Sequence, residues 1–487
     1  MKRILTLFVA LSLLTALMSC GGGTQPSQVE TTAGEADAAD GAITTIAETA
    51  DPLADNLPEA DFNGRKFRVV TSDEYAYQIY AEEETGDVTN DAIFRRNLTV
   101  EERFGFEVES LINSAGKFQW YPPIVATVLA GEDAYDLVGH YAYNAHVAIS
   151  GGAYLNWKDI PDIDLDRVWW NSEINDRATF NGKLFAVTGY LATTVMQSTY
   201  AIFVNTRLAG NYGYDLKSLY GMVEDGEWVI DKFTPMMKDM YVDLNGDGAR
   251  DKDDQYGYGS MPDNSLDFWL AAFDQPITSR DKDTIKIEIM TDKTVSALNK
   301  LLDFYYNNEG VINYETVTAY VSNYGHDRFA AGLTVFAPSF FSAAYDMYRD
   351  MDDDYGILPI PKWDEKQDKH FTHIMDKYTI WGTPVTIGDT EFVGIVTEAL
   401  CAESYRSVYP VFYDTALKAK YSTDAATADM VDLIMDGVTF DLGFIFGEYL
   451  GKVQTMIREH IKTNNPDFAS DYASRVFKID ELNSFYE

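Results

Sequence analysis

Cysteine is nearly absent from the 487-residue chain, which contains only Cys20 and Cys401. Two cysteines allow at most one intramolecular disulfide. The folded part must therefore be held together by its own hydrophobic core, which a chain of this length can form. Cys401 lies in an apolar, helix-like context, where we expect a buried packing role instead of a reactive thiol.

Positive charge is scarce as well. Lysine and arginine number 38 against 77 aspartates and glutamates, which gives a formal net charge of −39 at pH 7. Nucleic acids and anionic membrane surfaces attract clustered basic side chains, so this balance argues against both as docking partners. The acidity does not identify a ligand, because an acidic surface also serves solubility alone.

The common catalytic motifs are missing. The chain has no Gly-x-Ser-x-Gly elbow, no His-Glu-x-x-His, no Walker loop and no Rossmann glycine fingerprint. Of its six histidines only His370 and His373 lie close together, and we expect a surface pair there instead of a zinc site. A carboxylate pair for glycoside hydrolysis cannot be recognised among 77 acidic residues, because such pairs arise by chance.

An apolar run from Ile4 to Met18 follows the basic residues Lys2 and Arg3. The run is shorter than the ~20 residues that a membrane-spanning helix needs. Basic residues before a short apolar run are typical of a secretory signal peptide, so we predict that residues 1–19 are removed.

The end of that run, Leu17-Met18-Ser19-Cys20, resembles the lipobox of bacterial lipoproteins. The resemblance implies that Cys20 is acylated and holds the protein on the extracytoplasmic side of the cell membrane; an unmodified Cys20 after an ordinary signal peptide is the alternative. Residues 20–58 consist mainly of small, polar and acidic residues that cannot bury enough surface to fold, which predicts a flexible linker.

Strand-like and helix-like segments alternate after the linker. β-Branched and aromatic residues predict strands at 66–71, 135–140, 200–205 and 334–338, the last ending at Pro338. Apolar residues at helical spacing predict a helix over 90–104. Alternation of this kind indicates an α/β fold, in which ligands bind at the carboxyl ends of the strands.

Several segments in a particular order point to a family. They are Tyr135-Asp136-Leu137-Val138, Asn181-Gly182-Lys183-Leu184-Phe185-Ala186-Val187, Phe203-Val204-Asn205, Asp225-Gly226-Glu227-Trp228 and Tyr355-Gly356-Ile357-Leu358-Pro359-Ile360-Pro361. Their order and spacing resemble those of bacterial extracellular solute-binding proteins of the carbohydrate-uptake type (family 1), the surface receptors of ABC importers. The resemblance spans nearly the whole chain from residue 60.

The resemblance implies a two-lobed, periplasmic-binding-protein-like α/β fold of the class II type, with a hinge and a ligand cleft between the lobes. Residues 59–190 and 376–420 would form lobe one, and residues 195–375 and 421–487 lobe two. It further implies a monomer that is not an enzyme, which captures a carbohydrate, in particular an oligosaccharide, by hinge closure and delivers it to permease subunits. A solute sensor, a binder of a non-sugar ligand and a surface carbohydrate-active enzyme are the alternatives.

An acidic loop at 243–254, Asp-Leu-Asn-Gly-Asp-Gly-Ala-Arg-Asp-Lys-Asp-Asp, fits the grammar of a calcium loop. Calcium takes six to eight oxygen ligands, so oxygen-bearing side chains must recur at alternate positions around a glycine turn. The candidate ligands are Asp243, Asn245, Asp247, the Ala249 carbonyl, Asp251 and Asp254, with Asp254 in place of the usual glutamate. A structural calcium ion is the prediction, and a solvated acidic turn is the alternative.

Sugar receptors combine aromatic platforms with charged or amide groups, and 14% of this chain is aromatic. For any one aromatic residue core packing is the simpler role, so position in the predicted fold ranks the candidates. Loops after the strands and one segment of lobe two supply them: Asp73, Glu74, Tyr75, Tyr77, His140, Tyr141, Tyr143, Trp269, Phe340 and Phe341.

Overall fold

The computed structural model describes residues 51, 53–114, 121–260, 266–281, 284–314, 324–418 and 425–487. Pro52–Glu487 forms one compact unit. The predicted signal peptide, Cys20 and all but the end of the predicted linker lie outside the described residues, so these assignments stay predictions. Within the described residues, no helix is both long enough and apolar enough to cross a membrane.

A four-stranded sheet with the order β12-β3-β1-β2 forms the centre of what we call the first lobe. Its strands are β1 (Arg65–Ser72), β2 (Phe106–Asn113), β3 (Leu137–Tyr141) and β12 (Thr379–Gly382). β1 pairs in parallel with β2 and β3, and β12 joins the edge of β3 in the antiparallel direction. β3 is buried along its whole length, and β1 is buried from Val69 to Ser72, because helices cover the sheet on both sides.

The helices of the first lobe end where the sequence places capping residues. α1 starts after Asp87, whose carboxylate accepts from the backbone amides of Thr89 and Asn90, and it ends at Gly105 in the left-handed conformation. The prediction of a helix over 90–104 is confirmed. The main helices are α1 (Val88–Phe104), α2 (Tyr121–Leu129), α3 (Ala145–Ser150), α4 (Ser172–Ala178) and α14 (Thr390–Glu403).

A five-stranded sheet with the order β10-β4-β9-β5-β8 forms the centre of the second lobe. Its strands are β4 (Tyr200–Asn205), β5 (Tyr256–Ser260), β8 (Val311–Asn313), β9 (Thr334–Phe340) and β10 (Tyr355–Leu358). The predicted strands at 200–205 and 334–338 are confirmed, except that β9 continues beyond Pro338. On the side that faces β5, the described pairing of β9 ends at Phe336. Pro338 therefore loses no hydrogen bond to β5 through its missing N–H.

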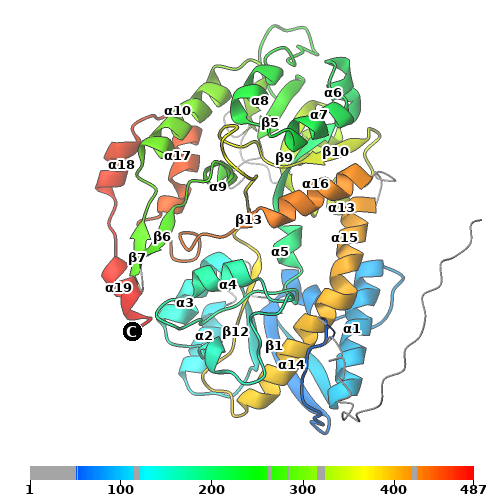
Figure 1. The fold of residues 1–487 in the computed structure, drawn as a ribbon, viewed down its shortest axis with the longest axis vertical. Helices are drawn as coiled ribbons and strands as arrows, with labels where there is room; N and C mark the ends of the chain where they lie inside the picture. Colours follow the sequence, from blue (N-terminus) through cyan, green and yellow to red (C-terminus); the bar gives the residue numbers. More distant parts are fainter. Residues whose placement is uncertain are drawn as a thin grey trace, which may run out of the picture. The chain divides into compact units, whose positions relative to one another are not determined.

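Helices also surround the second sheet, as Figure 1 shows for α6, α7, α8 and α16. Those that follow its strands or pack on it are α6 (Thr206–Asn211), α7 (Leu216–Glu224), α8 (Ile230–Met237), α9 (Phe268–Ala272), α10 (Asp292–Tyr306), α12 (Tyr324–Ala330), α13 (Ala343–Asp346) and α16 (Ala425–Asp436). The C-terminal helices are α17 (Met456–Thr463), α18 (Phe468–Ser474) and α19 (Ile479–Ser484). Because α17 packs on α10, we assign it to the second lobe.

Shorter elements complete the chain. They are the single-turn helices η1 (Asp73–Gln78), η2 (Ala142–Asn144), η3 (Trp157–Asp159) and η6 (Val453–Thr455), the π-helical turn η5 (Ser404–Val408), the helices α5 (Thr194–Gln197) and α15 (Tyr409–Lys418), and two strand pairs, β6 (Thr278–Asp281) with β7 (Thr284–Ile287) and β11 (Thr372–His373) with β13 (Val438–Thr439).

The chain passes from the first lobe to the second and back at two adjacent segments, and it passes to the second lobe again through α15, which contacts both α1 and α13. The first includes α5 and leads into β4, and the second leads from β11 back to β12. They pair through a bridge between Thr199 and Ile374, and the Met375 amide donates to the Ser198 carbonyl at 2.9 Å. The Thr379 amide donates to Thr194 Oγ1 at 2.8 Å. These hydrogen bonds tie the two crossings together at the point where the lobes meet.

Candidate functional site

A cavity of about 450 Å³ is lined by residues from both lobes. Its volume falls in the range typical of small-molecule sites. The lining residues are Tyr121, Tyr143, Asn144, His146, Asp267, Asp376, Phe444, Ile445, Gly447, Glu448, Gln454, Thr455 and Arg458. We call the part formed by Tyr121, Tyr143, Asn144 and His146 the first-lobe wall. The part formed by Asp267 and by the lining residues from Phe444 to Arg458 is the second-lobe wall.

The first-lobe wall continues into a cluster of tyrosines at the strand ends. Tyr141 ends β3, and its ring lies edge-on to Tyr75 at 4.9 Å and parallel to Tyr143 at 5.9 Å between ring centroids. The Tyr141 hydroxyl donates to Glu74 Oε2 at 2.6 Å. Burial raises the pKa of the Tyr141 hydroxyl, so it stays a donor. The structure thus brings together four of the predicted site residues, Glu74, Tyr75, Tyr141 and Tyr143.

Asp376 joins this cluster from the second crossing. The Tyr143 amide donates to the Asp376 carbonyl at 3.3 Å, and the Ala142 amide donates to the Tyr378 carbonyl at 3.0 Å. Burial, and then the Asp376 carboxylate, raise the pKa of Tyr143. A carboxylate on the crossing between the lobes therefore lies beside the aromatic wall.

A buried arginine positions the η1 segment that carries Tyr75. Arg96, on α1, donates to the carbonyls of Gln78 and Ile79 at 2.9 and 3.0 Å. It also donates to Asn97 Oδ1 at 2.8 Å. Burial lowers the pKa of Arg96 to about 10, which leaves the guanidinium charged at neutral pH. Arg96 therefore fixes the end of η1 through its backbone.

The second-lobe wall contains a buried ion pair. Arg458, on α17, lies 3.2 Å from Asp267, and the two side chains are 15% and 3% exposed. Gln454 and Thr455 come from η6, one turn before. Breaking such a pair leaves an uncompensated buried charge, so the two side chains fix each other's position.

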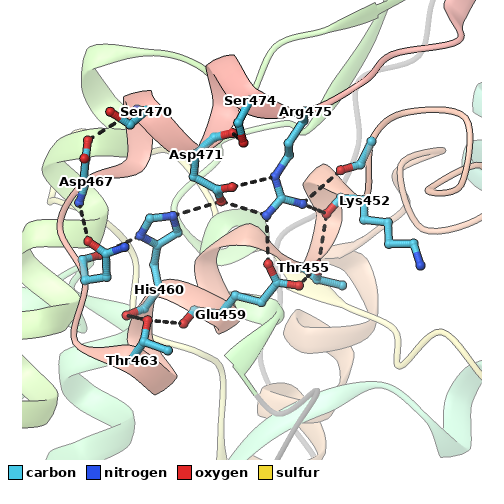
Figure 2. Close-up of polar contacts among 12 residues, drawn as sticks. Lys452, Thr455, Glu459, His460, Thr463, Asp467, Ser470, Asp471, Ser474 and Arg475 are labelled. Carbon is cyan, nitrogen blue, oxygen red and sulfur yellow. Dashed lines mark hydrogen bonds and ion pairs between the residues drawn. The ribbon is translucent and has the colours of Figure 1, made fainter.

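A polar network behind α17 holds this wall in place (Figure 2). Arg475 donates to Asp471 Oδ2 and Glu459 Oε2 at 2.7 and 2.8 Å, and to the Lys452 carbonyl at 2.9 Å. Glu459 in turn accepts from Thr455 Oγ1 at 2.6 Å. Charge-assisted hydrogen bonds are among the stronger ones in proteins, so Arg475 connects the tail of the chain to a residue of the cavity.

One buried amide atom in the cavity, Gln454 Oε1 on the second-lobe wall, finds no hydrogen-bond partner among the described residues. Buried polar groups are nearly always satisfied, so this acceptor points to a polar ligand. The Asn144 side chain, on the first-lobe wall, hydrogen bonds to Tyr143. Neither Gln454 nor Asn144 is among the sequence-predicted candidates.

Other predicted site residues lie away from the cavity. Trp269 is 0% exposed, and its Nε1 donates to the Tyr305 hydroxyl at 3.0 Å, so it packs in the core of the second lobe. Phe341 is buried in a separate core cluster, and Phe340 packs on the ring of His326. None of the three lines the cavity, so these positions do not support their predicted role as ligand contacts.

The remaining three candidates flank the tyrosine cluster. His140 is buried against the Tyr154 hydroxyl, and burial lowers its pKa to about 3. Tyr77 is exposed and its hydroxyl donates to Gln197 Oε1, in the first crossing. Asp73 is exposed at the start of η1, where its Oδ1 accepts from the Glu74 amide at 2.9 Å.

The expectation of a surface pair at His370 and His373 is wrong. Both side chains are buried, and burial lowers their pKa values to about 4 and about 3. His373 belongs to β11 and its ring stacks on Phe444 at 4.0 Å. A short strand pair, which the sequence did not reveal, brings both histidines inside.

The acidic loop at 243–254 folds around its own amides. Asp243 accepts from the amides of Gly246 and Gly248 at 2.7 and 2.9 Å, and both glycines have positive φ angles. Asp247 accepts from the Ala249 amide at 2.7 Å. No group of three or more His, Cys, Asp or Glu side chains in the described part of the chain is arranged to hold a metal ion. Two of the predicted calcium ligands, the Asn245 amide and the Ala249 backbone carbonyl, are not of these residue types. The calcium site therefore stays a prediction.

Comparison with known proteins identifies the fold. No family model matches the sequence, and no curated protein matches it. Among solved structures, UgpB from Mycobacterium tuberculosis in complex with glycerophosphocholine aligns with a TM-score of 0.55 at 14% identity, over 86% of this chain and 98% of UgpB. A solute-binding protein of an ABC transporter from Thermotoga lettingae, bound with α-D-tagatose, gives 0.53 at 13% identity, over 87% and 100%.

A third solved structure, a cyclo/maltodextrin-binding protein complexed with maltotetraose, has a TM-score of 0.55 at 12% identity, over 84% of this chain and 96% of its own. These alignments cover nearly all of each relative and most of this chain. The predicted two-lobed, periplasmic-binding-protein-like fold is therefore confirmed.

Proposed function

We propose that the protein is the substrate-binding protein of an ABC importer, which captures a carbohydrate, specifically an oligosaccharide. The observation that carries the proposal is the cavity of about 450 Å³ whose walls come from both lobes, next to the two crossings. Its aromatic rings and amide groups suit the apolar faces and hydroxyls of a sugar. The fold, which is that of solved substrate-binding proteins, supports the same assignment.

Capture would proceed by closure of the lobes. Each wall alone offers half of the contacts, so a ligand that touches both walls favours the state in which they are close. The adjacent crossings, joined by backbone hydrogen bonds, are the place where a small change of backbone angles would move one lobe relative to the other. A permease that recognises the closed state would then receive the solute, and no chemistry on the ligand is required.

Attachment through lipid at Cys20 completes the proposal. The lipobox-like sequence and the linker composition of residues 20–58 support it. Asp55, at the end of the predicted linker, pairs with Arg103 at 2.7 Å and Arg406 at 3.3 Å, both on the first lobe. The chain would thus be tethered outside the membrane as a monomer, with the permease subunits as its partners.

A structural calcium ion in the loop at 243–254 is a separate proposal. All of the candidate ligand atoms are oxygens, which calcium prefers, and they recur at alternate positions around the glycine turn. The amide contacts of Asp243 and Asp247 turn their carboxylates toward the inside of the loop, which supports the assignment.

Thermal unfolding of the purified chain against a panel of oligosaccharides, monosaccharides and peptides tests the main proposal. A ligand at 100 times its dissociation constant stabilises the native state by about 2.7 kcal/mol, and a rise of a few degrees with one sugar class is the expected result. Chromatography of the same mixtures should show no product. Turnover of a sugar would favour the enzyme alternative, and a response to peptides alone would favour the non-sugar alternative. A sensor and a transport receptor differ in whether permease subunits bind the chain.

A further inference from the structure

Two segments reach from the second lobe to the first, away from the crossings. One is the strand pair of β6 and β7, and the other consists of α19 and the two residues after it. We call β6, β7 and residues 479–486 together the clasp. In Figure 1 the clasp lies at the left and α5 near the middle, and α3 and α17, which carry cavity residues, lie between them. The clasp and the crossings are therefore on different sides of the cavity.

Arg280, on β6, holds the end of α4 in the first lobe. Its Nη1 donates to the Asp176 carbonyl at 3.0 Å and to the Thr179 carbonyl. Both carbonyls lie at the C-terminal end of α4, where the helix dipole favours a cation. On the second-lobe side, the Thr278 amide of the same strand donates to Asp441 Oδ2 at 2.9 Å. β6 is thus fixed in the second lobe and contacts the first.

Tyr486, which follows α19, places its ring between the lobes and is 3% exposed. Its ring centroid lies 5.3 Å from that of Phe180 and 5.4 Å from that of Phe185, both in the first lobe. On its other side, the ring lies 6.3 Å from Phe446, in the second-lobe wall. The Tyr486 carbonyl accepts from Asn181 Nδ2 at 2.9 Å. Buried aromatic rings at such separations contribute large apolar contacts, so Tyr486 joins the two lobes.

The parts of the clasp contact each other and the rim of the cavity. Asn483 Oδ1, on α19, accepts from the Ile285 amide of β7 at 3.3 Å. The Phe485 ring lies edge-on to Tyr449 at 5.2 Å between centroids. Tyr449 in turn lies edge-on to His146, in the first-lobe wall, at 6.1 Å. The clasp is therefore a continuous structure that ends beside a residue of the cavity.

Opening of the cavity has to break the contacts of the clasp with the first lobe. In a rotation about the crossings, a part of the second lobe moves further the further it lies from the rotation axis. Residues beside the crossings keep their backbone hydrogen bonds in such a motion, whereas the clasp lies on another side of the cavity. The contacts of Arg280 and Tyr486 with the first lobe therefore exist only while the lobes are close.

We propose that the clasp holds the lobes together in the absence of solute, and that its release limits how fast a bound solute leaves. The inference rests on the proposed function of the cavity and adds a regulation of that site. Contacts outside the cavity raise the fraction of chains that are closed before solute binds, and the apparent affinity rises with that fraction. Loss of the clasp contacts should shift the ligand-free chain toward separated lobes.

A distance measurement on the ligand-free chain tests the clasp. Spin labels are attached at Ala126→Cys on α2 and at Ala469→Cys on α18, which are exposed positions of the first and second lobe on the clasp side. Cys20→Ser removes one native thiol, and the other, Cys401, is buried. Double electron–electron resonance on the full-length chain then gives the distribution of distances between the lobes.

Arg280→Gln weakens the contact with α4, and Tyr486→Ala removes the ring between the lobes. Each should enlarge the population of long distances about threefold, because contacts made only in the closed state are lost. Lys286→Gln is the matched control, because this exposed side chain of β7 pairs with Asp281 of the same strand pair, and it should leave the distribution unchanged.

Arg280 is exposed, so its substitution should not impair folding, and it decides the test even if Tyr486→Ala does not fold. Equal distance distributions in Arg280→Gln, Lys286→Gln and the unmodified chain would overturn the clasp.

The two proposals fail in different ways. If no sugar of the thermal-unfolding panel stabilises the chain, the carbohydrate assignment is rejected, whereas the distances, which are measured without solute, still decide on the clasp. With a sugar that does stabilise the chain, stopped-flow dissociation from Arg280→Gln should be about threefold faster than from Lys286→Gln. A shifted distance distribution with an unchanged dissociation rate would reject the role of the clasp in solute release.

Discussion

The first-lobe wall and the second-lobe wall reach the same cavity by different routes. Tyr141 and Tyr143 lie where β3 ends, and Tyr75 lies where the neighbouring strand β1 ends, so the sheet itself brings these rings together. Arg458 and Gln454 belong to the C-terminal segment, outside both sheets, and side-chain contacts hold that segment. A wall at strand ends depends on backbone topology, whereas a wall built from the C-terminal segment depends on side chains, both its apolar residues in the core and the polar network of Arg475.

The largest effect should come from the backbone anchor of the first-lobe wall. Arg96→Met removes the donor to four buried acceptors, and we expect a loss of about 3 kcal/mol in the free energy of unfolding by urea. Arg95→Met is the matched control, because Arg95 is 66% exposed in a surface pair with Glu84 and should change stability by less than about 0.5 kcal/mol. Equal losses at the two positions would contradict the anchoring role of Arg96.

The corresponding substitution in the second-lobe wall is Arg475→Gln. It removes hydrogen bonds to Asp471, Glu459 and the Lys452 carbonyl, and should cost about 2 kcal/mol because these partners are less buried than those of Arg96. The free energy of unfolding and the affinity for the sugar that stabilises the unmodified chain should both fall. Lys478→Gln, in an exposed pair with Glu481 at 3.8 Å, is the control and should change neither. Unchanged affinity in the Arg475 variant would show that this network does not position the residues of the cavity.

The first lobe should also respond to pH through Glu398 on α14. This buried carboxyl group accepts from Trp169 Nε1 and Trp170 Nε1 at 2.7 and 2.8 Å, and burial raises its pKa to about 7. The unfolded chain releases this proton near pH 4.5 and the folded chain near pH 7, so stability falls as the pH rises through that window.

Glu398→Gln removes this titration. Relative to the unmodified chain, the variant should gain at least about 1.4 kcal/mol between pH 4.5 and pH 7, the equivalent of one pKa unit. Urea unfolding of both proteins at the two pH values measures the difference, in which the titration of all other carboxyl groups cancels. A difference that does not change with pH would show that Glu398 is ionised throughout.

Tyr143 provides a direct test of the aromatic half of the comparison. Tyr143→Ala should weaken binding of the sugar that stabilises the unmodified chain about tenfold, or about 1.4 kcal/mol, because the ring contact is lost. Tyr80→Ala removes an exposed ring from the same lobe, outside the cavity lining, and should leave the dissociation constant unchanged by calorimetric titration. If both variants bind equally well, the first-lobe wall does not contact the solute.

The smallest expected effect belongs to the acidic loop of the second lobe. Calcium at five times its dissociation constant should raise the free energy of unfolding by about 1 kcal/mol. Asp243→Asn should reduce this response, whereas Asp350→Asn should keep it. A melting temperature that is the same with calcium and with a chelator would reject the calcium proposal.

The same contrast between the walls explains what could be predicted from the sequence. Tyr75, Tyr141 and Glu74 follow recognisable strands, and parallel topology alone brings such loops to one edge of a sheet. Asp376 and Arg458 come from segments that follow no strand of the first sheet, so nothing local in the sequence marks them. Asp267 and Trp269 show the limit of such predictions. The sequence analysis chose Trp269 from this segment as a ligand contact because of its aromatic ring, but Trp269 packs in the core and Asp267 lines the cavity. Local sequence located the turn but could not tell which side chain faces the cavity.

The position of β12 at the edge of the first sheet has a consequence for biosynthesis. A ribosome delivers β1, β2 and β3 early, but β12 arrives only after all the strands of the second sheet. Until residue 382 has emerged, β3 exposes an unpaired edge to which other chains could bind. The first lobe therefore cannot finish folding before all the strands of the second sheet have been synthesised, and the nascent chain has to remain incompletely folded through most of its synthesis.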